Sequence, residues 1–207
     1  MDNRKKIIFV INPISGTQGK EQILAWVSER LDREKYDMEV LYTQYAGHAV
    51  EIAAQKAAEK AFAVVAIGGD GTINEIARSL VHTDTALGII PCGSGNGLAR
   101  HLQIPLEPKK AVDILNEGRL EVIDYGKIND KPFFCTCGVG FDAFVSLKFS
   151  QAGKRGPLTY LEQTLRESLK YRPEVYELEM DGNASTRYKA FLIACGNASQ
   201  YGNNAYI

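Results

Sequence analysis

The sequence lacks the features that mark membrane-spanning and secreted proteins. No apolar run approaches the roughly 20 residues that a membrane-spanning helix needs. The apolar run that follows the first basic residues ends at Asn12, which is too short for the core of a secretory signal peptide. Any membrane contact is therefore expected to be peripheral.

Cysteine is also scarce, with four residues among 207: Cys92, Cys135, Cys137 and Cys195. Cys135 and Cys137 are separated by one residue and have no matching pair, so their spacing is not that of a zinc site. Most of the cysteines lie in apolar runs, where a free thiol behaves as a small buried hydrophobe. We expect reduced thiols in a cytoplasmic protein.

An excess of either charge is missing as well, because the formal net charge is -1. No basic footprint for nucleic acid exists, and we expect no nucleic-acid partner. Residues 143–161 contain no acid and include Lys148, Lys154 and Arg155. We interpret this stretch as a solvated basic loop, with contact to anionic headgroups or phosphates as the alternative.

Apolar, β-branched runs alternate with segments of helical periodicity over the first half of the chain. The runs predict strands at residues 7–11, 38–43, 62–67 and 86–90. The periodic segments predict helices at residues 22–31, 49–57, 73–81, 98–102 and 109–115. This alternation is typical of an α/β fold with a parallel sheet, in which ligands bind beyond the carboxyl ends of the strands.

The pattern changes near Gly118. Residues 120–128 and 132–136 predict a hairpin, residues 158–171 a helix, and residues 174–180 and 187–195 a second hairpin around Asp181-Gly182-Asn183. We expect a parallel-sheet α/β domain over residues 1–121, followed by an incomplete antiparallel, β-rich domain over residues 122–207. About four strands would be marginal alone, so we expect the chain to be truncated.

The most specific motif is Gly68-Gly69-Asp70-Gly71-Thr72, between a predicted strand and a predicted helix. Glycines let a backbone approach a ligand closely, and amides at a helix start bind phosphate oxygens. A carboxylate beside phosphates is repulsive unless a cation lies between them, so Asp70 predicts a Mg²⁺ ligand. Ile73, Asn74 and Glu75 follow within the next turn. For Glu75, a capping role and a ligand role stay open.

Three further loops follow predicted strands. Asn12-Pro13-Ile14-Ser15-Gly16 offers side chains that can donate to phosphate or cap a helix. Pro91-Cys92-Gly93-Ser94-Gly95-Asn96 places two glycines and a hydroxyl before a helix. Thr43 precedes Gly47-His48-Ala49, where His48 is either a catalytic group or, more commonly, a capping group. The common position of these loops predicts one shared site.

Other phosphate-binding motifs are missing. Residues 16–21, Gly-Thr-Gln-Gly-Lys-Glu, approach a P-loop but lack the hydroxyl after Lys20 and the spacing of the first glycine. The motif set of protein kinases is absent. His82 and His101 have no evident metal partners.

Together, Asn12-Pro13-x-Ser15-Gly16, the stretch from Gly68 to Glu75 and Pro91-x-Gly93-Ser94-Gly95-Asn96 with Ala99-Arg100 resemble the diacylglycerol kinase catalytic-domain family. That family includes bacterial lipid kinases and the sphingosine and ceramide kinases. The similarity is strongest over residues 7–102. Later segments, residues 133–144 and 197–204, resemble parts of the family's β-sandwich domain.

The resemblance implies ATP and Mg²⁺ as cofactors and a lipid substrate at a membrane surface. It implies phospholipid metabolism in the cytoplasm, with peripheral membrane association. Asp70 would act through Mg²⁺, and the general base would lie outside residues 1–207. The implied nucleotide-binding residues are Asn12, Pro13, Ser15, Gly16, Thr43, Gly68, Gly69, Asp70, Gly71, Thr72, Ile73, Asn74, Glu75, Gly93, Ser94, Gly95 and Asn96.

Several alternatives remain at this point. Ser94 stands where many bacterial members have threonine, so a sphingoid-base or ceramide kinase is an alternative to a kinase of diacylglycerol. An NAD kinase-like enzyme shares the Gly-Gly-Asp-Gly loop. A non-catalytic nucleotide-binding fragment is the third alternative, and we expect residues 1–207 to bind ATP weakly and turn over little. The sequence does not decide the oligomeric state, for which a homodimer is one option.

Overall fold

The computed structural model describes residues 3–14, 19–141, 143–144, 171–202 and 205–206. The chain forms two compact units. The first comprises Met1–Cys135 with Asn197–Ile207, and the second comprises Thr136–Gly196. The domain boundary expected near residue 122 stays a prediction.

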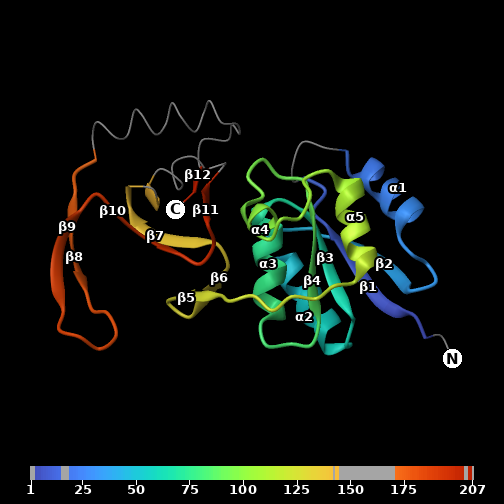
Figure 1. Ribbon diagram of the computed structural model, residues 1–207, viewed down its shortest axis with the longest axis horizontal. Helices are drawn as coiled ribbons and strands as arrows, with labels where there is room; N and C mark the ends of the chain where they lie inside the picture. Colours follow the sequence, from blue (N-terminus) through green and yellow to red (C-terminus); the bar gives the residue numbers. More distant parts are fainter. Residues whose placement is uncertain (1–2, 15–18, 142, 145–170, 203–204, 207) are drawn as a thin grey trace. The chain divides into compact units, whose positions relative to one another are not determined.

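A four-stranded parallel sheet forms the centre of the first unit, as the sequence predicts (Figure 1). Its strands are β1 (Lys5–Ile11), β2 (Tyr36–Tyr42), β3 (Ala63–Gly68) and β4 (Ala86–Pro91), in the order β2-β1-β3-β4. Ile11 lies opposite both Tyr42 and Ile67, and Gly68 lies opposite Pro91. All four strands therefore end at the same edge, which brings the loops that follow them together.

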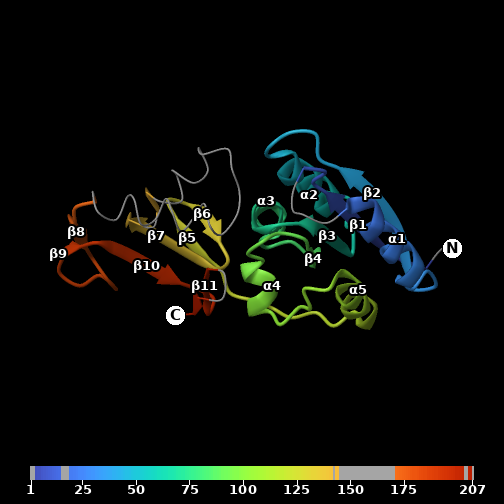
Figure 2. The same cartoon turned by 90° about the horizontal axis from the view of Figure 1, so that it is seen from above.

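Helices cover both faces of this sheet (Figures 1 and 2). They are α1 (Lys20–Arg30), α2 (His48–Ala58), α3 (Asp70–Leu80), α4 (Gly97–His101) and α5 (Pro108–Glu117). Alternate residues of each strand face opposite sides of a sheet. Residues such as Phe9 therefore pack with α1 and α5, whereas residues such as Val10 pack with α2, α3 and α4. Both sides of the sheet form continuous buried clusters.

Two local predictions were wrong. The helix α3 begins at Asp70, not at Ile73, because Gly69 is extended and the backbone turns into the helix directly after it. The strand predicted over residues 120–128 is limited to β5 (Gly126–Ile128). Leu120 and Val122 are exposed, and residues 119–125 pair with no strand of the described part of the chain. Ile123 and Tyr125 pack against the core, so the apolar alternation reflects an inward-facing side of the segment but no strand pairing.

The remaining hairpins agree with the turn signals. β5 pairs antiparallel with β6 (Lys131–Phe133), and Asn129 and Asp130 between them both have positive φ, as a two-residue hairpin turn requires. A short antiparallel pair, β11 (Gln200–Gly202) and β12 (Ala205–Tyr206), also belongs to the first unit.

The second unit contains antiparallel strands. β7 (Thr136–Gly140) pairs with β10 (Leu192–Gly196), and β8 (Glu174–Leu178) pairs with β9 (Thr186–Ala190) around the turn at Gly182. The predicted helix at residues 158–171, except Tyr171, and the basic side chains within residues 143–161 lie outside the described residues. The fold class predicted from the sequence, an α/β domain followed by antiparallel sheets, is confirmed.

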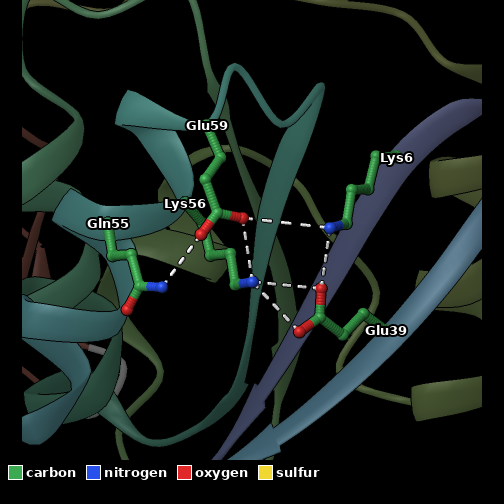
Figure 3. Close-up of polar contacts among 5 residues, drawn as sticks. All are labelled: Lys6, Glu39, Gln55, Lys56 and Glu59. Carbon is green, nitrogen blue, oxygen red and sulfur yellow. Dashed lines mark hydrogen bonds and ion pairs between the residues drawn. The ribbon is translucent and has the colours of Figure 1, made fainter.

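A network of four charged side chains joins α2 to β1 and β2 (Figure 3). Lys56 Nζ lies 3.0 Å from carboxylate oxygens of both Glu39 and Glu59, and Lys6 Nζ lies 3.1 Å from Glu39. Lys56 is 8% exposed, so this pairing is screened less than a surface ion pair. The hydrogen bond from Lys56 is the main cause that lowers the pKa values of Glu39 and Glu59.

None of the helices within the described ranges is long and apolar enough to cross a lipid bilayer.

Candidate active site

The loops singled out in the sequence meet at the carboxyl edge of the sheet. Asn12 follows β1, Thr43 follows β2, Gly69 follows β3 and Cys92 follows β4. Backbone hydrogen bonds extend the sheet by one step beyond the strands, from Thr43 N to Ile11 O and from Cys92 N to Gly68 O, both 2.9 Å. The start of every loop is therefore held in register with its neighbour.

The loop after β3 is compressed against the helix that follows it. Gly68 is the last residue of β3, Gly69 is the N-cap of α3, and Asp70 to Thr72 form its first turn. A Cβ on Gly68 would lie 2.7 Å from the Cβ of the buried Thr72, which no real side chain tolerates. The Asn12 side-chain amide donates to Thr72 Oγ1 at 3.5 Å. The first turn of α3 is thus tied to both β3 and the loop after β1.

The loops after β3 and β4 touch through glycine backbone. A Cβ on Gly93 would lie 2.7 Å from the Cα of Gly69, and one on Gly69 would lie 3.2 Å from the Cα of Gly93. The packing of one loop on the other therefore requires glycine at position 93 and leaves little room for a side chain at position 69. A Cβ on Gly71, by contrast, would meet no protein atom within 4 Å.

The Asp70 carboxylate joins the same two loops. Its Oδ2 accepts a hydrogen bond from Asn96 N at 2.8 Å, and its Oδ1 accepts one from Gly97 N at 2.6 Å. A Cβ on Gly95 would lie 2.7 Å from Asp70 Oδ2. The first residue of α3 thus accepts bonds from the amides at the start of α4, a contact that sequence reasoning had not foreseen.

Asn96 shapes the loop after β4. The residue is buried and lies in the left-handed region with φ 53°, which asparagine tolerates better than most residues. Its Oδ1 accepts a bond from Gly93 N at 2.9 Å, and its Nδ2 donates to Gly93 O at 2.7 Å. Arg100 Nε donates to Gly95 O at 2.9 Å. The side chains of Asn96 and Arg100 therefore stabilise the conformation of the loop after β4.

The loop after β2 joins the edge through α3. Glu75 Oε1 accepts a hydrogen bond from Gly47 N at 3.3 Å, and Thr43 is buried. His48 Nδ1 accepts a bond from Gln44 N at 3.1 Å. His48 therefore contacts the backbone of its own loop, and Glu75 fixes that loop to α3.

The other predicted site residues differ in exposure. Ser94 is exposed, Asn74 is half-buried and Ile73 is part of the core. Pro13 is exposed in the loop after β1, while Ser15 and Gly16 lie outside the described residues.

Within the described ranges, no three histidine, cysteine, aspartate or glutamate side chains gather as a metal site. Asp70 is exposed, and each of its oxygens accepts one backbone bond, which leaves lone pairs for a cation. Mg²⁺ is commonly bound by one or two carboxylates together with substrate phosphates and water. The residues present thus fit a single protein ligand to Mg²⁺, namely Asp70.

A thiol lies close to this carboxylate. Burial raises the pKa of the Cys135 thiol to about 11, and the charge of Asp70 adds to the effect. A Cβ on Gly97 would lie 3.6 Å from Cys135 Sγ. Cys135 is therefore a neutral thiol that lies beside Gly97, the first residue of α4.

Comparison with known proteins identifies the family. The model of the diacylglycerol kinase catalytic domain matches residues 6–128, which include every loop of the site. The chain belongs to the diacylglycerol kinase catalytic-domain family. A diacylglycerol kinase of Mycobacterium tuberculosis (strain CDC 1551 / Oshkosh) is 31% identical over 98% of this chain, and one of Bacillus subtilis (strain 168) is 32% identical over 86%.

Solved structures show the same fold. A crystal structure of a diacylglycerol kinase from Bacillus anthracis str. Sterne superimposes with a TM-score of 0.74 at 24% identity, covering 99% of this chain and 67% of that one. The chain spans 68% of the length of the Mycobacterium protein and 60% of that of the Bacillus subtilis protein. The family resemblance expected from the loop motifs is confirmed.

Proposed function

We propose that this chain forms the ATP-binding part of a lipid kinase that transfers the γ-phosphoryl group of ATP to a lipid hydroxyl, with diacylglycerol as the first candidate. The names of the relatives support a kinase of this family. The supporting observation in the structure is the start of α3. The amides of Asp70, Gly71 and Thr72 have no intrahelical partner because they begin the helix, and no side chain caps it.

These amides suit an anionic ligand. The N-terminus of a helix has a partial positive charge, and its amides point away from the helix toward a bound phosphate. Gly71 leaves the backbone of this turn accessible, since no Cβ covers it. The contacts of Asp70 with the start of α4 hold the turn in place before the nucleotide binds. Preorganised donors of this kind stabilise charge that develops during phosphoryl transfer.

Mg²⁺ would be bound by Asp70 together with phosphate oxygens and would neutralise their charge. The proposed nucleotide-binding residues are those expected from the sequence, from Asn12 and Thr43 to Glu75 and Asn96. A lipid hydroxyl is presented at a membrane surface, so we also propose a cytoplasmic protein in peripheral contact with a bilayer.

The test is a transfer assay with the complete gene product that contains this chain. Radiolabelled ATP and Mg²⁺ are supplied with mixed micelles of diacylglycerol, monoacylglycerol, sphingosine or ceramide, and with NAD in a parallel reaction. We expect label on a glycerolipid. Label on a sphingoid base or ceramide would change the substrate class, label on NAD alone would replace the proposal, and no label on any acceptor would refute it.

A further inference from the structure

Lys20 has an unusual environment for a lysine. It is the first residue of α1, and its ammonium nitrogen is buried with no oxygen or nitrogen acceptor, beside the Cys92 thiol, which is a weak acceptor. Among the buried side-chain nitrogen and oxygen atoms of the described residues, it is the one without an oxygen or nitrogen partner. A buried ammonium without a counter-charge is unfavourable, since its desolvation is not offset.

The position of Lys20 places this charge beside the candidate site. Cys92, directly after β4, is buried, and burial raises the pKa of its thiol while the nearby Lys20 ammonium opposes that rise. The next residue, Gly93, packs on Gly69. The Lys20 ammonium therefore lies at the edge of the sheet where the loops after β3 and β4 meet.

The protein provides no anion for this ammonium in the described part of the chain. The Asp70 carboxylate accepts bonds from Asn96 and Gly97, and no carboxylate of the described residues accepts a hydrogen bond from Lys20. A ligand anion would complete the environment. We propose that Lys20 binds the β- or γ-phosphate of the nucleotide, opposite the amides at the start of α3.

This inference rests on the proposed function, because it names a binding residue of the same site. It also gives a function to the lysine of residues 16–21, a segment that resembles a P-loop without matching its motif. An ammonium is a compact point charge with three donors, and it binds phosphate without the planar geometry that arginine needs. Lys20, at the start of α1, would thus bind the phosphates together with the amides at the start of α3.

The test compares Lys20→Met, Lys20→Arg and the control Lys110→Met, which removes the same charge from the exposed surface of α5. Fluorescent N-methylanthraniloyl derivatives of ATP, AMP and adenosine are titrated by fluorescence. We expect Lys20→Met to weaken ATP binding roughly 10- to 100-fold, as is typical of a lost charge-assisted hydrogen bond. AMP binding should change little, Lys20→Arg should restore part of the affinity, and Lys110→Met should match the wild type.

Thermal unfolding of the ligand-free variants separates binding from a structural role. Removal of an unpaired buried charge should leave the unfolding temperature of Lys20→Met unchanged or higher. A lower temperature with equal losses for ATP and AMP would overturn the inference in favour of a structural lysine. If Lys20→Met keeps the wild-type preference for ATP over AMP, only the role of Lys20 fails. If the wild type binds ATP no better than adenosine, the proposed nucleotide site fails as well.

Discussion

Two glycines of the candidate site should respond to the same substitution with opposite changes in stability. Gly71 lies in the first turn of α3, and a Cβ there meets no protein atom within 4 Å. Alanine restricts the unfolded chain more than glycine, so Gly71→Ala should stabilise the ligand-free protein by about 0.5–1 kcal/mol. Gly93→Ala should destabilise it by about 1–3 kcal/mol, because its Cβ would lie 2.7 Å from Gly69 Cα and 3.0 Å from Asn96 Oδ1.

ATP binding should weaken in both variants, although their stabilities diverge. In Gly71→Ala the new methyl group projects from the turn whose amides are proposed to bind phosphate, and loss of one such bond corresponds to roughly tenfold in affinity. Thermal unfolding and calorimetric titration with Mg-ATP measure the two effects separately. A Gly71→Ala variant that is more stable and binds ATP with wild-type affinity would refute the close approach of phosphate to this turn.

Three further predictions concern side chains. Asp70→Asn should lose about 1–2 kcal/mol of stability, since one backbone amide then faces an NH₂ group. The ATP affinity of this variant should no longer depend on Mg²⁺. Equal Mg²⁺ dependence of ATP affinity in this variant and in the control Asp84→Asn would exclude Asp70 as the metal ligand. Lys56→Met should cost about 1–2 kcal/mol in urea unfolding at pH 7. The lowered pKa of Glu39 makes this contribution present above its ordinary value of 4.5 and lost as pH falls through the lowered value, so a difference that does not shrink as the pH is lowered below 4.5 would contradict the role of the pair. Alkylation of Cys135 by iodoacetamide, followed by mass spectrometry, should rise about tenfold per pH unit up to about pH 11; a plateau near pH 9 would show an ordinary thiol.

Much of the fold could be predicted because its signals are local. The four buried strands of the first unit appear as short β-branched runs, and their common direction follows from the helices between them. The gathering of Asn12, Gly69 and Gly93 at one edge follows from that topology alone. The turn at Gly182 was predictable from the side-chain preferences of tight turns.

The remaining features depend on contacts between segments distant in sequence. Asp70 accepts hydrogen bonds from residues 26 and 27 positions later, and no periodicity marks such a pairing. The buried Lys20 ammonium lies beside Cys92, a residue distant in sequence. The strand expected over residues 120–128 forms only at Gly126–Ile128, because apolar alternation predicts a strand only where a partner strand exists, and residues 119–125 have none in the described part of the chain.

Hydrogen–deuterium exchange with and without Mg-ATP tests the proposed position of the nucleotide most directly. If the phosphates bind where the loops after β3 and β4 meet, exchange of the amides at residues 69–73 and 93–97 should slow when ATP is added. Exchange in the β8–β9 hairpin, which belongs to the second unit, should stay unchanged. Unchanged exchange at residues 69–73 under saturating Mg-ATP, or slowing confined to other segments, would contradict a nucleotide site at this edge of the sheet.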